Sequence, residues 1–443
     1  MSSSEIYCNS LTPKSVDVVV IGAGLSGLRA ALNIQAAGFS CAVVEATDRV
    51  GGKTLTLPSK KNGPGVNDLG AAWINDTTQS EMFKLVQHYG LQTEIQIDRG
   101  NDIWVHDDGV ILTPHGILPV RFSLFYHSLM TTRSLVLILN RCCQSLIGVE
   151  TKEISALSFL QFCKSGTGLQ FMISDTKHGA QYLRVKQGMQ TISQNMAKEL
   201  KPGSLWPSNP ITHIEQCTKT GVCTVRSANK AVFSAKKVIL SVATPLYRTI
   251  NFSPPLPTEK QHLAQENFLG YYSKMIFVFE KPWWRTAGLS GEIKAQSQGP
   301  FLFSVDTSVS DDDQWSISCF IVGSRGLEWS KLPQKERHLS IWSQFRSAFE
   351  NVNLNLERIE VPKPIKSLEF EWTKQDFFLG GPCPVSPPGL LSSVDGDALR
   401  KPFENIHFVG TETALEWKGY MEGAIRSGDR GGAEVIGKLQ AKH

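Results

Sequence analysis

The sequence predicts an α/β fold with two domains, the first of which is assembled from separated parts of the chain. The chain has 443 residues, more than a single hydrophobic core usually holds. A strand–helix–strand pattern opens it at residues 14–47, and patterns typical of strands return only at 205–250 and 271–322. We therefore expect one domain from residues 14–79, 183–250 and 388–443, and a second, α+β domain from residues 80–182 and 251–387.

The opening unit is the most clearly patterned part of the chain. The run "DVVVIG" is continuously apolar, as a buried parallel strand should be. The stretch "LSGLRAALNIQAAG" places apolar residues at helical spacing and ends at Gly38, a suitable C-cap. The run "SCAVVEA" follows as a second strand, so the three segments form the start of a βαβ unit.

The rest of the chain is assigned more coarsely. Residues 80–182 look mostly helical, whereas "PITHIEQ", "GVCTVRSA" and "AVFSAKKVILSVAT" predict strands within 205–250. The run "SPPLP" at 253–257 predicts a linker where the chain crosses between domains, and a Gly- and Pro-rich loop is expected at 377–391. Helices are expected at 332–350 and at about 420–439.

Composition excludes several classes of function. The net charge is +4 and the basic residues form no dense run, so nucleic-acid binding is not expected. The nine cysteines are scattered and odd in number, which favours reduced thiols in an intracellular protein. No group of His and Cys has the spacing of a metal site, so no metal is expected.

The expected location follows from what targeting segments require. The opening "MSSSEIYCNSLTPKS" lacks the apolar stretch of a secretory signal. The apolar run "SLVLILN" at 134–140 is too short to span a bilayer, and the final "GKLQAKH" carries no hydrophobic anchor. We expect a cytoplasmic protein without a transmembrane segment, and a homodimer is left open.

A glycine motif at the end of the first strand predicts a Rossmann-like dinucleotide site. "GAGLSG" places Gly22, Gly24 and Gly27 in the pattern G-x-G-x-x-G, with Ala23 between the first two. The first glycine makes the tight turn, the second lets the backbone approach a pyrophosphate, and the third lets helix and strand pack closely. Glu45 ends the second strand, where an acid binds ribose hydroxyls.

The residues after Glu45 favour FAD over a nicotinamide cofactor. In "EATDRVGGKTLT", Arg49 can meet phosphate, and Gly51 and Gly52 permit a second close approach of backbone. A flavin dinucleotide, with its longer contact along the protein, uses such a loop.

At this point the chain resembles the flavin amine oxidase family, which contains monoamine oxidases, polyamine oxidases and L-amino-acid oxidases. "EATDRVGGKTLT" is similar to the family's E-A-R-D-R-x-G-G-R, with Thr47 and Lys53 where arginine is usual. "NDLGAAWI", "PITHIEQ" and "ENFLGYYSKMIFVFEKPWW" resemble three further motifs, and the details most resemble monoamine-oxidase-like proteins of fungi. These matches imply an FAD-binding domain of the GR2 type, with cofactor contacts at Lys53, Gly70, Ala71, Ala72, Trp73 and Ile211.

The stretch "GTETALEWKGYMEGAIRSGDRGG" at 410–432 resembles the C-terminal flavin signature of the family. The resemblance implies that Gly410, Thr411 and Glu412 approach the pyrophosphate and ribityl groups. Tyr420 and Met421 would stand where a helix begins near the pyrimidine end of the flavin ring, and a helix N-terminus there stabilises negative charge.

The family's chemistry is removal of a hydride equivalent from the carbon beside an amine nitrogen, with O2 reoxidising the flavin and hydrogen peroxide as a product. The resemblance implies catalytic roles for Lys274, beside the flavin, and for Tyr420 and Trp417, at an aromatic cage. The second cage tyrosine is missing. Cys383 is displaced in "GGPCPVSPPG" from the family's "GGC", so non-covalent FAD is favoured and a covalent link through Cys383 is left open.

Alternatives stay open beside a simple amine oxidase. One is an oxidative cyclase or dehydrogenase acting on an alkaloid-like compound of secondary metabolism, and another is a weakly active flavoprotein with a binding role. The short stretch at 111–157 and the altered cage keep the first of these open. An amino-acid oxidase is less favoured because no arginine clearly binds a carboxylate, although Arg184 and Arg121 are candidates.

Overall fold

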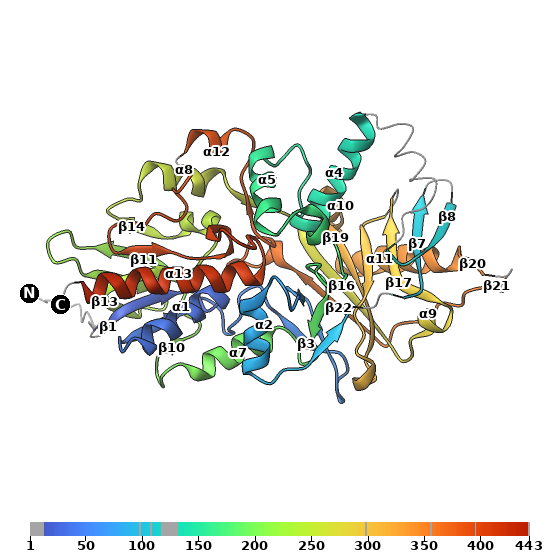
Figure 1. Ribbon diagram of the computed structural model, residues 1–443, viewed down its shortest axis with the longest axis horizontal. Coiled ribbons are helices and arrows are strands. Elements are labelled where there is room, and N and C mark those ends of the chain that lie inside the picture. The colour runs from blue at the N-terminus through green and yellow to red at the C-terminus, as the bar shows by residue number, and fades with distance from the viewer. Residues whose placement is uncertain are drawn as a thin grey trace, which may run out of the picture.

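The computed structural model describes residues 13–96, 99–106, 109–116, 132–296, 299–354, 357–394 and 396–441. The molecule is elongated and contains two large sheets side by side (Figure 1). The sheet that carries the first strand lies with helices α1 and α13 on the left, and the second sheet lies with α11 on the right.

The first sheet has eight strands in the order β10-β2-β1-β13-β12-β11-β14, with β24 also paired to β13. Its central strands are parallel, and β12 joins as an antiparallel strand between β11 and β13. This mixed sheet carries the Rossmann-like unit predicted from the sequence. Its strands are β1 Lys14–Ile21, β2 Cys41–Val44, β10 Leu205–Trp206, β11 Ile211–Gln216, β12 Cys223–Ser227, β13 Val232–Leu240, β14 Asn251–Ser253 and β24 Ile406–Phe408.

Helix α1 (Leu25–Ala36) covers this sheet together with the C-terminal helix α13 (Met421–Gln440). Glycines let the two helices approach closely, because a Cβ on Gly428 would lie 2.5 Å from the Ser26 carbonyl oxygen. An ion pair of 2.6 Å between Arg29 and Asp429 then fixes their register. The last helix of the chain is therefore held against the first, which brings both ends of the sequence to one site.

The second sheet has seven strands in the order β22-β16-β19-β18-β17-β7-β8. All neighbours are antiparallel except β17 and β7. Side chains alternate along β16: Met275, Phe277 and Phe279 pack in a core with Phe345 of α11, and Lys274 lies on the opposite face. The strands are β7 Asn101–His106, β8 Gly109–Pro114, β16 Tyr272–Phe279, β17 Leu289–Ala295, β18 Phe303–Asp306, β19 Trp315–Val322 and β22 Lys366–Glu371.

The remaining strands form small sheets near the junction and at one tip. They are β3 Thr56–Pro58 with β4 Val66–Asp68; β5 Trp73–Ile74 and β6 Thr93–Ile95 on either side of β9 Leu183–Val185; β15 Phe268–Leu269 with β23 Pro384–Val385; and β20 Asn353–Leu354 with β21 Glu357–Arg358.

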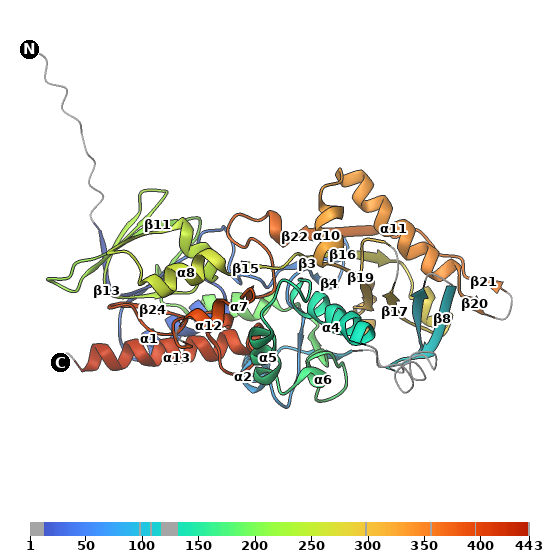
Figure 2. The ribbon, with the colours of Figure 1, turned by 90° about the horizontal axis from the view of Figure 1, so that it is seen from above.

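Helices α4 and α5 flank the junction between the two large sheets (Figure 2). The remaining helices are α2 Ser80–His88, α4 Thr132–Ile147, α5 Ala156–Ser165, α6 Leu169–Met172, α7 Gln190–Glu199, α8 Thr258–Glu266, α9 Trp283–Thr286, α10 Gly323–Ser330, α11 Gln334–Glu350 and α12 Leu390–Ser393. The described residues also form the 3-10 helices η1 Thr244–Thr249, η2 Ser310–Asp312, η3 Trp372–Lys374 and η4 Thr411–Thr413.

The prediction that residues 80–182 are mostly helical is wrong at 93–95, 101–106 and 109–114, which form β6, β7 and β8. The reason is that β7 is completed by distant sequence: it pairs in parallel with β17, nearly 190 residues away, from Asn101 with Leu289 to Val105 with Ala295. The sequence around residues 101–106 does not indicate that its partner strand lies so far along the chain. The strands predicted within 205–250 and the helices predicted at 332–350 and 420–439 are confirmed.

Candidate active site

A large cavity of about 1570 Å³ runs from the carboxyl ends of β1 and β2 to the face of the second sheet. Backbone of the glycine motif lines one end, and aromatic and charged side chains of β17, β18 and β19 line the other. The position at the ends of parallel strands is the one that the Rossmann topology reserves for a dinucleotide.

The glycine motif has the backbone that each of its positions requires. Gly22 has φ of +101°, and a Cβ there would lie 2.7 Å from the Ser241 carbonyl oxygen. A Cβ on Gly27 would lie 2.0 Å from the Gly22 oxygen. Gly24 differs, because a Cβ built there would lie 3.8 Å from its nearest neighbour, the Gly52 Cα. The space beside Gly24 therefore belongs to the cavity. Gly24 is also the N-cap of α1, and no side chain caps that helix end.

Glu45 lines the cavity and also organises the loops around it. One carboxylate oxygen accepts a 2.7 Å hydrogen bond from the Ala23 amide, and the other accepts 2.9 Å and 2.8 Å bonds from the amide and hydroxyl of Thr47. Thr47, which replaces a usual arginine of the family motif, therefore fastens the acid in place.

The second loop lies against the first. The Gly51 amide donates to the Ala23 oxygen at 2.9 Å, and both Gly51 and Gly52 line the cavity. Arg49 does not line it: its guanidinium donates to the oxygens of Gly52 (2.7 Å) and Thr54 (3.0 Å). The structure thus places Arg49 behind the loop as a brace. Lys53 does line the cavity and donates to the Pro382 oxygen at 3.1 Å, and burial lowers its pKa.

Ile211, the first residue of β11, lies at the same end of the cavity and is 8% exposed. Gly70, Ala71 and Ala72, from the loop between β4 and β5, and Trp73, the first residue of β5, line the middle of the cavity.

At the far end of the dinucleotide region the C-terminal signature reaches the cavity. Gly410 has φ of +136°, and Glu412 is buried, with its carboxylate accepting a 3.0 Å bond from the Thr244 amide. The Thr411 hydroxyl donates to the backbone carbonyl oxygen of Tyr420 at 2.7 Å. Helix α13 begins directly afterwards at Met421 and has no side-chain cap, so its positive end faces the cavity.

Lys274 stands on β16 beside the Asp68–Gly70 loop. Its ammonium donates to the backbone carbonyl oxygens of Gly70 (2.6 Å) and Asp68 (3.0 Å) and lies 5.1 Å from the ring centres of both Trp73 and Phe320. Lys274 does not itself line the cavity, whereas both rings do. Burial lowers the pKa of Lys274 to about 8. The charge thus sits immediately behind an aromatic wall of the cavity.

Tyr420 and Trp417 have different surroundings. The Tyr420 ring lines the cavity and stacks at 6.0 Å on Phe162. Trp417 does not line it: its ring packs edge-on against Tyr420 at 5.0 Å, it is 2% exposed, and its Nε1 donates to the Thr78 oxygen at 2.9 Å. Trp417 is a core side chain that supports Tyr420.

The remaining predicted candidates do not face the cavity. Cys383 is 2% exposed and burial raises its pKa to about 12, although Pro382 and Pro384 on either side line the cavity. Arg184 is buried and donates to the oxygens of Thr307 (2.9 Å) and Ser308 (2.7 Å). Arg121 lies outside the described residues.

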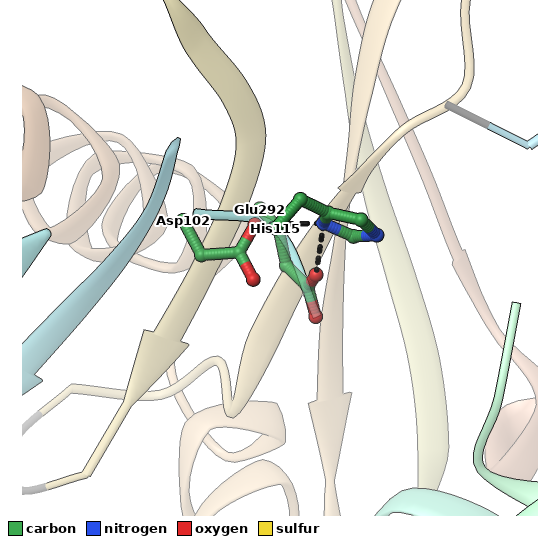
Figure 3. Close-up of side chains that lie close together, drawn as sticks. All are labelled: Asp102, His115 and Glu292. Carbon is green, nitrogen blue, oxygen red and sulfur yellow. Dashed lines mark hydrogen bonds and ion pairs between the residues drawn. The ribbon is translucent and has the colours of Figure 1, made fainter. Parts of the chain in front are cut away.

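A charged cluster at the second-sheet end of the cavity was not predicted. It contains Asp102 of β7, His115 after β8, Asp175 after α6, and Glu292 and Lys294 of β17 (Figure 3 draws three of them). These residues are far apart in the sequence, and three lie in the region expected to be helical. The one local signal is the charged alternation at 292–294 within an otherwise apolar strand.

The residues of the cavity fit FAD. The absence of a side chain at Gly24 leaves room for a pyrophosphate, and Glu45 lies where an acid binds ribose hydroxyls. The N-termini of α1 and α13 have no side-chain cap, and both face the cavity. Glu45, Gly24 and Gly52 would hold the adenosine and pyrophosphate part. Gly410, Thr411 and the start of α13 would hold the flavin part.

Comparisons with known proteins agree with this cavity. The profile of a family described as flavin containing amine oxidoreductase matches residues 25–135 and 150–436. The chain belongs to this family. It is an FAD-dependent enzyme that oxidises an amine.

The chain is 26% identical to a probable flavin-containing monoamine oxidase A of Dictyostelium discoideum, over 96% of this chain and 98% of that one. It is 28% identical to the flavin-containing amine oxidase B of Mus musculus, over 96% and 87%. Among solved structures, cyclohexylamine oxidase from Brevibacterium oxydans superposes with a TM-score of 0.84 at 25% identity, over 96% and 99%. A putrescine oxidase with bound putrescine shares the fold, with a TM-score of 0.82 at 24% identity, over 96% and 100%. In the described part of the chain, no helix has both the length and the apolar character needed to cross a membrane.

Proposed function

We propose that the enzyme oxidises a primary or secondary amine to an imine and passes the electrons to O2, which is reduced to hydrogen peroxide. The C–H bond beside nitrogen breaks, its hydrogen leaves with two electrons, and the nitrogen releases a proton, so that one amine and one O2 give one imine and one peroxide. FAD, when bound, supplies the two-electron acceptor between them.

One observation carries this proposal: the aromatic lining beside Lys274, where Gly70 and Tyr420 meet the cavity. Trp73, Phe303 and Phe320 form a continuous wall there, with Phe303 and Phe320 stacked at 4.4 Å. Loss of water in this lining and the nearby positive charge of Lys274 disfavour a second ammonium ion, so an amine that enters reacts in its neutral form with its nitrogen lone pair available. The same wall excludes water from the reacting carbon.

Some finer assignments stay predictions. They are the division into domains, the cytoplasmic location, the homodimer and a fungal role in secondary metabolism. The altered aromatic cage, in which the second tyrosine is missing, favours as second candidate an oxidative cyclisation or dehydrogenation of an alkaloid-like compound. A binding role with weak turnover is the third.

The test is the stoichiometry of turnover with a panel of alkylamines and arylalkylamines. We expect one O2 consumed and one hydrogen peroxide formed per amine, measured with an oxygen electrode and a peroxidase-coupled assay. Reduction of the flavin by an alkaloid-like amine but by no simple amine would favour the second candidate. Absence of turnover with every amine of the panel would contradict an oxidase of simple amines.

The placement of Cys383 predicts that FAD is held without a covalent bond. Its thiol is buried outside the cavity lining and its pKa is raised to about 12, so the reactive thiolate is scarce. Acid precipitation of the enzyme should therefore leave flavin in the supernatant, and Cys383→Ala should retain flavin equally. A yellow pellet with flavin fluorescence in wild type, lost in the alanine variant, would show a covalent link.

The placement of Trp417 predicts a loss of stability when it is changed to phenylalanine. The variant leaves the Thr78 oxygen without its indole donor and reduces a buried ring, at a cost of about 1–3 kcal/mol of unfolding free energy. We expect a lower thermal midpoint with kcat little changed in the FAD-loaded enzyme. A fall in kcat of about 100-fold at an unchanged midpoint would instead place Trp417 among the reacting groups.

A further inference from the structure

One row of side chains crosses the cavity face of the second sheet. The strand register pairs Lys274 with Phe320, Phe320 with Phe303, Phe303 with Lys294, and Lys294 with Trp104. Residues directly opposite each other point to the same face of a sheet. The row therefore connects the lysine beside the flavin position to the charged cluster at the other end of the cavity.

The register also gives the separation of the two ends. Lys274 and Lys294 are three strand spacings apart, which corresponds to about 14 Å. Glu292 precedes Lys294 by two residues on the same strand, and both line the cavity. The aromatic wall lies between them. A substrate that reacts beside Lys274 and extends along the wall brings its far end to Glu292.

Within the cluster, Asp102 receives the short bonds. It is fully buried and accepts from His115 Nδ1 at 2.8 Å, Lys294 Nζ at 2.9 Å and the Ser290 hydroxyl at 2.7 Å. His115 Nε2 donates to Asp175 at 2.8 Å. These contacts engage both cations of the cluster with other carboxylates.

Glu292 receives only long contacts. Among the described residues, its ion pairs are to His115 Nδ1, which Figure 3 draws, and to Lys294 Nζ, both at 3.4 Å, whereas charge-assisted bonds are usually about 2.7–2.9 Å. Counted by formal charge, the three carboxylates exceed His115 and Lys294 by one negative charge when Glu292 is ionised. Asp175 and Glu292 both line the cavity, but Asp175 bonds His115 at 2.8 Å, whereas Glu292 has only the 3.4 Å contacts and therefore has lone pairs to offer.

We propose that Glu292 binds a second, cationic group of the amine substrate, so that the preferred substrates are diamines or longer polyamines whose two nitrogens span the aromatic wall. This inference rests on the proposed function. A primary or secondary ammonium donates two or three N–H groups, which is the chemistry that the partly satisfied carboxylate accepts.

Two other occupants fit the cluster less well. Asp102, His115 and Glu292 bring ligand atoms within 4.8 Å of one another, but the carboxylates that bond His115 raise its pKa to about 10, and a protonated imidazole cannot coordinate a metal ion. An anion would have to displace Asp102 or Asp175 from the cations that they already bind. A cation requires no such exchange.

Protonation of Glu292 supports the same occupant. Burial raises the pKa of Glu292 to about 7. The charges of Lys294 and His115 act to lower this pKa, and those of Asp102 and Asp175 act to raise it. The charge is therefore lost as pH falls through 7. The preference for a diamine over the monoamine of equal length should rise with pH through this region. Comparing the two substrates at each pH cancels the titration of the reacting nitrogen.

The test compares kcat/KM for each diamine with that for the monoamine of equal length: diaminobutane with butylamine, diaminooctane with octylamine, and diaminodecane with decylamine. The comparison is made in wild type, in Glu292→Gln and in the control Glu336→Gln. Glu336 is an exposed carboxylate on α11, away from the cavity lining. We expect wild type and the control to prefer the long diamines over their matched monoamines. Glu292→Gln should reduce that preference about tenfold or more, because the ligand loses a charged acceptor.

Binding without turnover gives a second readout. Calorimetry on the anaerobic holoenzyme with its flavin reduced beforehand measures affinity for diaminodecane and decylamine when no oxidation can occur. We expect a diamine preference in wild type that Glu292→Gln reduces by the same factor. Monoamine turnover with no diamine preference, or a preference that survives Glu292→Gln, would overturn this inference while the oxidase function stands. Failure of every amine to reduce the flavin would overturn the proposed function itself.

Discussion

Changing Gly24 to alanine is expected to weaken FAD binding by roughly 10- to 100-fold while leaving the fold intact. The added methyl group meets no protein atom closer than the Gly52 Cα at 3.8 Å, an ordinary contact distance. It projects into the space where the pyrophosphate would approach the backbone, and crowding of this kind costs about 1–3 kcal/mol. The measurement is FAD affinity of the refolded apoprotein, by quenching of flavin fluorescence, together with the circular dichroism spectrum.

The choice of a control variant for this experiment depends on the space around the other glycines. Gly27→Ala is unsuitable because its Cβ would lie 2.0 Å from the Gly22 oxygen, so loss of FAD would accompany damage to the turn. Gly437→Ala on α13 has open space around it and should keep both the fold and the flavin. Full FAD affinity in Gly24→Ala would contradict the assignment of the pyrophosphate to this cradle.

Changing Lys274 to methionine is expected to slow turnover by about 100-fold, chiefly in the step with O2. The variant removes the cation behind the Trp73 and Phe320 rings and leaves the oxygens of Asp68 and Gly70 without their donor. Since the pKa of Lys274 is lowered to about 8 by burial, the ammonium is present below that pH and is lost above it. Reoxidation in wild type should therefore slow as pH rises through 8.

Stopped-flow measurement separates the two halves of the reaction. Wild type and Lys331→Met, an exposed lysine on the surface, should show the pH-dependent reoxidation, and Lys274→Met should be slow at every pH. Equal reoxidation rates in wild type and Lys274→Met would assign Lys274 a purely structural role in holding the loop.

The parts of the molecule that sequence predicts well are those fixed by local steric requirements. Gly22 and Gly27 must be glycine because backbone oxygens fill the space that a side chain would occupy. The glycine motif in the sequence therefore predicts the tight turn in the structure. The C-terminal helix was predictable from its spacing, and its place beside α1 follows from glycines such as Gly428. These segments hold the two ends of the cofactor site.

The parts that were missed depend on pairings between distant segments. Strand β7 is defined by β17, and the cluster around Glu292 exists only because that pairing places Asp102 opposite β17. Arg49 shows a second limit. Its type and position suit a phosphate, yet neighbouring carbonyl oxygens from Gly52 and Thr54 take its donors, and no spacing rule reveals that competition.

The most direct test of the account is an anaerobic titration of the purified, FAD-loaded enzyme with an amine, followed by admission of air. We expect the flavin absorbance in the visible region to bleach with one equivalent of amine per flavin and to return in air with one equivalent of hydrogen peroxide. A protein that binds FAD but is bleached by no monoamine or diamine would contradict the assignment of the aromatic wall beside Lys274 as an amine oxidation site.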